Sequence, residues 1–203
     1  MSVTRFLAAA VVALSGLITA SQASAQAQQS AAGFYVGGSL GQSNFDKDIV
    51  SGLIASGRVD TSDTGYKFFG GYQFNRNVGL EVAYVDLGKA SYSGSYVDNG
   101  QTVIVTDGKV EVTGFNLSAV GAWPVAPNFD VFGKIGFLAW EDKASDISGG
   151  IPFSDTIDGT DLSFGFGANW HLTKNVRFRL EWERFRVDKT DADLFSIGAV
   201  YKF

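Results

Sequence analysis

Charged side chains recur at every second position near the end of the chain. Within residues 176–183, Arg177, Arg179, Glu181 and Glu183 alternate with apolar residues. Successive side chains of a β-strand point to opposite faces, so these four charges would share one face of a strand. Two cations and two carboxylates at this spacing can form ion pairs. If that face is enclosed they must do so, because an unpaired buried charge costs several kcal/mol.

Other residues that could do chemistry are sparse. Asp142, Asp146, Asp155, Asp158 and Asp161 could hold a divalent cation weakly, but they lack a fixed ligand spacing. A solvated acidic segment explains them better. The chain has no cysteine, which rules out a disulfide scaffold. We therefore predict neither a metal site nor another cofactor.

The elements that would position the charged residues are strands. In eight segments, apolar residues occupy every second position, as expected for β-strands. The 3.6-residue spacing of apolar residues that is typical of helices is nearly absent. These segments are 34–41, 67–73, 80–85, 115–123, 131–140, 162–170, 176–183 and 195–203. Short connections at 75–77, 124–128 and 173–175 alternate with long polar stretches near 44–64, 86–109 and 142–160, and a shorter stretch lies at 186–193.

This regular alternation of loop lengths predicts the fold class. A soluble sandwich or a lipocalin-like barrel gives no reason for it, whereas an outer-membrane barrel has short turns on one side of the membrane and long loops on the other. We predict an all-β protein: an eight-stranded antiparallel up-and-down transmembrane β-barrel with short periplasmic turns and long extracellular loops. High aromatic content (17 Phe, 7 Tyr, 4 Trp) together with 25 Gly favours such an all-β chain.

The first residues have the features of an export signal. Arg5 precedes an apolar stretch at 6–20, and Ala23-Ser24-Ala25 fits the small-residue pattern of a signal-peptidase site. We predict a cleaved signal peptide at 1–25 and a barrel domain at 26–203. The rest of the chain has no apolar run of about 18 residues, so helical membrane spans are excluded. The net charge of −5 argues against a nucleic-acid partner.

Outward-facing aromatic residues gather beside the short connections. They are Phe34, Tyr72, Phe74, Trp123 and Trp170. Aromatic side chains concentrate at both interfaces of a membrane, so these five predict an aromatic girdle at one interface.

The last strand has an apolar residue at every second position back from its end. The positions are Phe195, Ile197, Ala199, Tyr201 and Phe203. Such an ending resembles the assembly signal of outer-membrane proteins, which implies the barrel-assembly machinery as a partner during insertion. We expect the barrel to close on this strand and no peptidoglycan-binding domain to follow it.

Three segments resemble the OmpA-like transmembrane domain family. They are 70–75 with the following 78–81 and 87–88, then 179–182, and finally 196–203. The resemblance spans the predicted mature chain strand by strand, with unrelated loops. It implies a porin-family protein of the bacterial cell outer membrane whose neighbours are membrane lipid and lipopolysaccharide.

The family places an ion-pair network inside the barrel and links it to gating of a narrow channel. In each strand, the side chains opposite the apolar face would point into the barrel. The charged residues at these positions form the predicted network: Lys67, Glu81, Lys134, Arg177, Arg179, Glu181 and Glu183. The resemblance implies that Glu81 pairs with Arg179. Val120 and Asn169 stand where the family has a switching Lys and a second Glu, so the alternative ion pair of a gate requires Lys67 or Arg177 as a substitute.

These residues favour a structural, surface-exposed protein that is not an enzyme. It would support membrane integrity, with a possible adhesion or surface-antigen role through its loops and a host ligand that the sequence does not identify. The alternative is a narrow channel for ions or small solutes. A lipid-modifying enzyme fits less well, because barrels that modify lipid A need a His near a Ser at the outer rim. The single histidine, His171, lies beside a short connection at the other rim.

Overall fold

The computed structural model describes residues 32–46, 56–98, 101–148, 151–188 and 190–203. The predicted signal peptide, residues 1–25, lies outside the described residues. Within the described ranges, no helix has the length and hydropathy needed to cross a membrane.

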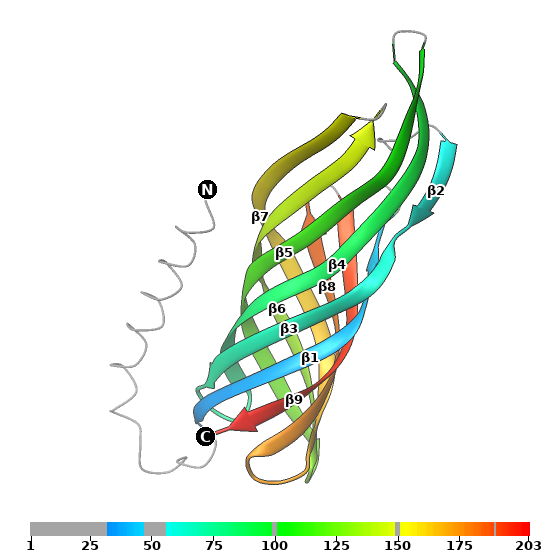
Figure 1. Ribbon diagram of the computed structural model, residues 1–203. Coiled ribbons are helices and arrows are strands. Elements are labelled where there is room, and N and C mark those ends of the chain that lie inside the picture. Colours follow the sequence, from blue (N-terminus) through cyan, green and yellow to red (C-terminus); the bar gives the residue numbers. More distant parts are fainter. Residues whose placement is uncertain (1–31, 47–55, 99–100, 149–150, 189) are drawn as a thin grey trace.

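In the described ranges, nine strands form one antiparallel sheet (Figure 1). They are β1 (Gly33–Phe45), β2 (Ser56–Asp60), β3 (Ser62–Gln73), β4 (Val78–Asp98), β5 (Gln101–Ala126), β6 (Phe129–Ser148), β7 (Ile151–His171), β8 (Val176–Val187) and β9 (Thr190–Lys202). Eight of them close into a barrel, because β1 pairs with both β3 and β9 while β4 pairs with β5. The predicted fold class is confirmed, and β2 is an additional short strand that pairs with β4 alone.

The two faces of the barrel wall differ as the period-two pattern predicts. Ile135 and Phe166 point outward and are each 62% exposed, whereas Lys67 points inward and is 0% exposed. A soluble protein would bury such apolar side chains. Their exposure around the whole barrel makes an apolar outer surface suited to lipid.

The interior contains an apolar layer above the charged residues. The side chains of Val85, Leu87, Val112, Phe185 and Leu194 are all nearly inaccessible and belong to one packed cluster. This layer lies toward the long-strand end of the barrel, since Val85 and Leu87 follow Glu81 on β4 and Phe185 follows Glu183 on β8 in that direction. The interior is therefore filled by side chains, as expected for eight strands.

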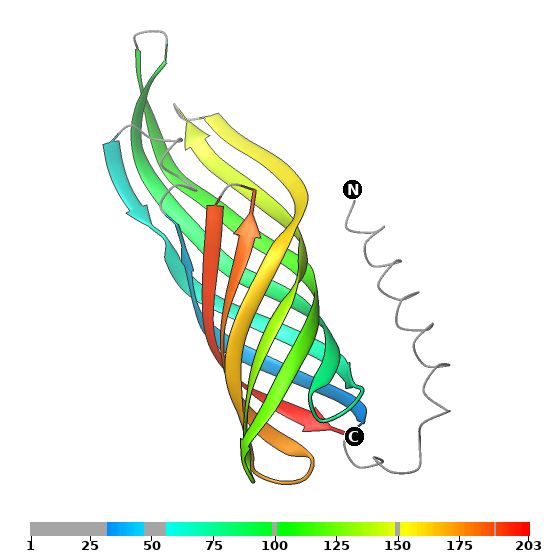
Figure 2. The same cartoon turned by 180° about the vertical axis from the view of Figure 1, so that it is seen from behind.

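The stretches predicted as loops are mostly paired strand. β4 and β5 stay paired as far as Asp98 and Gln101, and β6 and β7 as far as Ser148 and Ile151. The stretch at 186–193 also belongs largely to β8 and β9, which pair up to Val187 and Thr190. Above the membrane both faces of a strand can be polar, so composition alone suggested loops there. In Figures 1 and 2, the β4–β5 hairpin reaches beyond the other strands.

A β-bulge in β4 also interrupts the period-two alternation on which the strand prediction rested. Residues with odd numbers point inward up to Leu87, and residues with even numbers do so from Ala90 onward. The register of β4 against β5 shifts between Asp86 and Lys89, around Gly88 with its φ of 73°. The Asp86 carboxylate accepts a hydrogen bond from the Gly88 backbone N–H at 2.8 Å. One extra residue thus reverses the inward parity of the strand.

We expect Gly88→Ala to destabilise the barrel by about 1–2 kcal/mol, because its φ is unfavourable for any residue with a Cβ. The new Cβ would also meet Oδ2 of Asp63 at 2.7 Å. Urea unfolding followed by tryptophan fluorescence measures this change. The control is Gly133→Ala, whose Cβ would meet no atom closer than 3.9 Å. Equal stability of the two variants would contradict the bulge argument.

Candidate functional site

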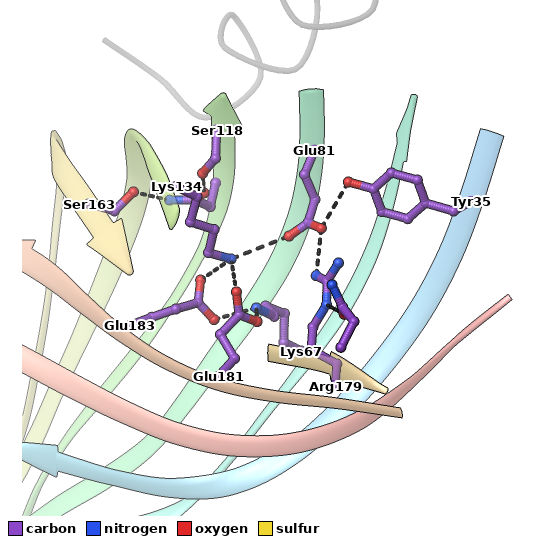
Figure 3. A network of polar contacts seen from close by, with 11 residues as sticks. Tyr35, Lys67, Glu81, Ser118, Lys134, Ser163, Arg179, Glu181 and Glu183 are labelled. Carbon is purple, nitrogen blue, oxygen red and sulfur yellow. Dashed lines mark hydrogen bonds and ion pairs between the residues drawn. The ribbon is translucent and has the colours of Figure 1, made fainter. Parts of the chain in front are cut away.

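Lys67 on β3 reaches across the lumen to β8. Its ammonium group contacts the carboxylates of Glu181 and Glu183 and is fully buried (Figure 3). These two carboxylates lie on the same face of β8, two residues apart, because strand side chains alternate. The strand geometry therefore presents a pair of acceptors to a single cation.

Lys134 on β6 joins the same two carboxylates to a third one. Its Nζ lies 2.8 Å from Glu181 Oε1 and 3.2 Å from Glu81 Oε1, and it also contacts Glu183 (Figure 3). Its side chain is as buried as those of its partners. One ammonium group thus holds carboxylates from β4 and β8.

Arg179 completes the network beside Glu81. Its Nη1 donates a hydrogen bond to Glu81 Oε2 at 2.7 Å, and the Tyr35 hydroxyl donates to the same oxygen at 3.1 Å. The guanidinium carbon lies 4.6 Å and 4.7 Å from the ring centroids of Phe69 and Phe132. Two aromatic rings at these distances add cation–π attraction to the ion pair of the guanidinium.

The charges of this network balance. Three cations (Lys67, Lys134, Arg179) meet three carboxylates (Glu81, Glu181, Glu183), all buried. A buried ion costs much less free energy when it is paired and hydrogen-bonded, so a neutral cluster is the stable way to enclose six charges. The arrangement is a layer of ion pairs that spans the lumen from β3, β4 and β6 to β8.

Arg177, the seventh predicted member, lies outside this cluster. It is buried near the short-turn end of β8, and its guanidinium carbon is 5.6 Å from the centroid of the Tyr35 ring. Its Nε and Nη2 have no hydrogen-bond partner among the described residues. The structure therefore brings six of the seven predicted residues together and separates Arg177.

Uncharged polar residues extend the network, and sequence analysis singled out only Asn169 among them, as the position where the family has a second Glu. Ser118 donates to Asn116 Oδ1, and Asn116 Nδ2 donates to Ser163 Oγ at 2.5 Å. Asn169 accepts a hydrogen bond from Arg179 Nε at 3.1 Å. All of them, like Tyr35, lie on the inward parity. Apart from Asn169, that parity was their only signal, since nothing in the residue types distinguished them from solvent-facing polar residues.

The predicted girdle residues lie at the short-turn end. Phe34 and Tyr72 are paired across β1 and β3 with ring centroids 4.7 Å apart, and the Tyr72 and Phe74 rings are 5.3 Å apart. Trp123 and Trp170 are exposed on the outer surface. Their role at a membrane interface stays a prediction.

The predicted assembly signal forms the outer face of the end of β9. Phe195, Ile197, Tyr201 and Phe203 are exposed, and Ala199 faces outward with them. The Phe203 backbone N–H donates to the Phe34 carbonyl at 3.0 Å, which joins this end to β1. Recognition by the assembly machinery stays a prediction.

The comparison with known families agrees with this barrel. The family model described as "Outer membrane protein beta-barrel domain" matches residues 10–203. The chain belongs to this family. It is accordingly a bacterial outer-membrane β-barrel protein of the OmpA-like kind, and the predicted resemblance and location are confirmed.

Relatives in this outer-membrane barrel family include outer membrane protein A of Salmonella typhi and of Shigella flexneri. They are 31% and 29% identical over 205 residues, which cover 96% of this chain and 54% of each relative. The chain thus spans about half the length of these relatives.

Solved structures show the shared fold. Ail, the attachment invasion locus protein of Yersinia pestis, aligns with a TM-score of 0.55 at 19% identity, covering 84% of this chain and 99% of that one. Neisserial surface protein A aligns with a TM-score of 0.51 at 19% identity, covering 85% and 99%.

Two positions differ from the ion-pair gate that the family resemblance implies. Asn169 bonds Arg179 and also donates to Asp130 Oδ1 at 2.6 Å, and Val120 provides no charge. Of the two cations considered as substitutes, Lys67 contacts Glu181 and Glu183, whereas Arg177 lies outside the cluster. Within the described residues, the carboxylates of β8 are therefore neutralised by Lys67 and Lys134.

Glu81→Gln tests the balance of the network. We expect it to lower the free energy of unfolding by about 3–5 kcal/mol, because it leaves buried cations in excess. Urea unfolding in lipid micelles measures the change. The matched control is Glu111→Gln, which breaks the accessible pair with Lys89 (38% and 51% exposed side chains) and should cost about 1 kcal/mol or less. Similar losses in the two variants would contradict the argument.

Asp142 gives the part of the barrel above the membrane a pH dependence. It lies 13 positions after the start of β6, beyond the ~9–11 residues that a transmembrane strand needs. Burial raises the pKa of this carboxyl from 3.8 to about 6. Between pH 6 and pH 4 the folded state therefore binds a proton that the unfolded chain does not, and stability rises as the pH falls.

Asp142→Asn should therefore be more stable than the wild type at pH 7 and should lose this rise between pH 6 and pH 4. The measurement is the free energy of unfolding from pH 4 to pH 8. Asp155→Asn, at an exposed position of β7, is the control and should keep the wild-type slope. An unchanged slope in Asp142→Asn would show that another group titrates.

Proposed function

We propose that this protein is a closed structural barrel that anchors surface-exposed segments in the outer membrane, and that it is neither a pore nor an enzyme. The observation that supports this most directly is the neutral layer of six buried charges across the lumen. An ion crossing that layer would have to separate buried ion pairs, and their charges would then lose their partners without being hydrated.

A second barrier supports a closed lumen. The apolar cluster that includes Leu87, Val112, Phe185 and Leu194 fills the interior on the other side of the charged layer. An ion gains nothing there to compensate for its lost hydration. Two different obstacles in series favour a mechanical role over transport.

The extended strands support a surface role. The β4–β5 hairpin carries paired strand well past the barrel (Figure 2). A rigid ribbon presents its side chains at a fixed distance from the membrane, next to lipopolysaccharide. The solved relative named for attachment and invasion shares the fold. We propose contact with a host surface or another external ligand through these extensions.

The contacts of His171 support a role other than catalysis. Its Nε2 lies 2.5 Å from Asp130 Oδ2, and the other oxygen of Asp130 accepts a hydrogen bond from Asn169. His171, Asp130 and Asn169 thus form a chain of polar contacts at the short-turn end. This end lies opposite the rim at which a lipid-A-modifying enzyme would work.

Conductance in planar bilayers tests the proposal. We expect no reproducible single-channel current from the wild type, and none from Arg179→Ala, because the apolar cluster still closes the lumen. A larger porin serves as the positive control, and protease resistance of the barrel verifies insertion. A reproducible wild-type current that changes in Arg179→Ala would favour the narrow channel instead.

A further inference from the structure

A cavity opens at the short-turn end of the barrel, below the charged layer. Its volume is about 440 Å³, and its lining includes Arg76, Asp130, His171, Lys174, Arg177 and Lys202. Cavities of ~300–1,000 Å³ are typical of small-molecule sites. In outer-membrane barrels the short turns face the periplasm, so this cavity would be reached from there.

Arg177 is the unusual member of this lining. It is 6% exposed, yet its Nε and Nη2 have no hydrogen-bond partner among the described residues. The other buried cations of the interior are all in ion pairs. A buried guanidinium with two unpartnered nitrogens is costly, and an anion that reached these nitrogens from the cavity would remove that cost.

The surrounding charges point the same way. Among the described lining residues, Arg76, Lys174, Arg177 and Lys202 face one carboxylate, that of Asp130. Asp130 already accepts a hydrogen bond from Asn169 and contacts His171. Lys202 shares its ammonium group with Gln73 Oε1 at 3.3 Å. The described lining residues therefore give the cavity a surplus of positive charge, and the Arg177 guanidinium with its two unpartnered nitrogens lies in its wall.

We propose that this cavity binds the phosphate group of a small soluble phosphate monoester from the periplasm. A phosphate monoester carries a charge of about −1.5 to −2 at pH 7, which suits several cations better than a carboxylate or a phosphodiester does. The guanidinium fork of Arg177 matches two phosphate oxygens at once. Binding is noncovalent and is independent of whether the lumen conducts.

The test uses the folded chain in octyl glucoside micelles, whose headgroups contain no phosphate. Inorganic phosphate and glycerol 3-phosphate are titrated by calorimetry. We expect saturable binding that Arg177→Gln weakens about tenfold or more, the loss expected for one charge-assisted hydrogen bond. Arg186→Gln removes the same charge from the far end of the same strand and should leave the affinity unchanged.

Arg177→Gln should fold at least as well as the wild type, because it removes an unpartnered buried charge. If it does not fold, Lys174→Gln at an exposed turn position replaces it and should weaken binding severalfold. A third titrant, short-chain phosphatidylglycerol, presents the phosphodiester of a lipid headgroup. Tighter binding of this lipid, equal weakening by Arg177→Gln and Arg186→Gln, or no saturable binding would each overturn the proposal.

Discussion

The main constraint on this structure is the free-energy cost of placing charged side chains inside the barrel. The middle of an eight-stranded barrel is filled by side chains, so an inward-facing ion there is stable only when it has a partner among other side chains. The six charges from Lys67 to Glu183 meet this condition through one neutral cluster. Tyr35 and Asn169 occupy hydrogen-bonding positions that the carboxylates and the guanidinium leave open. The apolar exterior and the polar interior are two results of the same alternation along each strand.

The interior is layered along the barrel axis, and each layer suits a different neighbour. The apolar cluster around Leu87 and Phe185 fills the end toward the outside, and the ion pairs fill the middle. The cavity at the short-turn end keeps the surplus cations, including Arg177. The bulge at Gly88 lets β4 pass from the barrel into its extension with apolar side chains still pointing inward. Stability, surface presentation and anion binding can therefore occupy separate levels of one small protein.

The sequence was sufficient for the wall of the barrel and for most of its charged interior. Period-two alternation identified eight strands, and their parity selected six residues that meet in space. It could not separate Arg177 from them, because parity gives the face of a strand and not the height at which a side chain finds a partner. The extensions were missed because the alternation there is interrupted by Gly88 and carried by polar residues. Pairing such as that of β2 with β4 depends on contacts between distant segments, which local patterns do not contain.

The ion pairs also determine how the barrel can open. Their members come from β3, β4, β6 and β8, and the strongest contacts cross the lumen from β8 to β3 and from β8 to β4. None of the three cations finds its carboxylates on the strand next to its own. A sheet that has not yet curled shut therefore exposes six separate ions to the bilayer, whereas the closed ring exposes none. Closing the ring and pairing these six charges are thus coupled, and a partly closed ring is disfavoured because it leaves ions unpaired in an apolar environment.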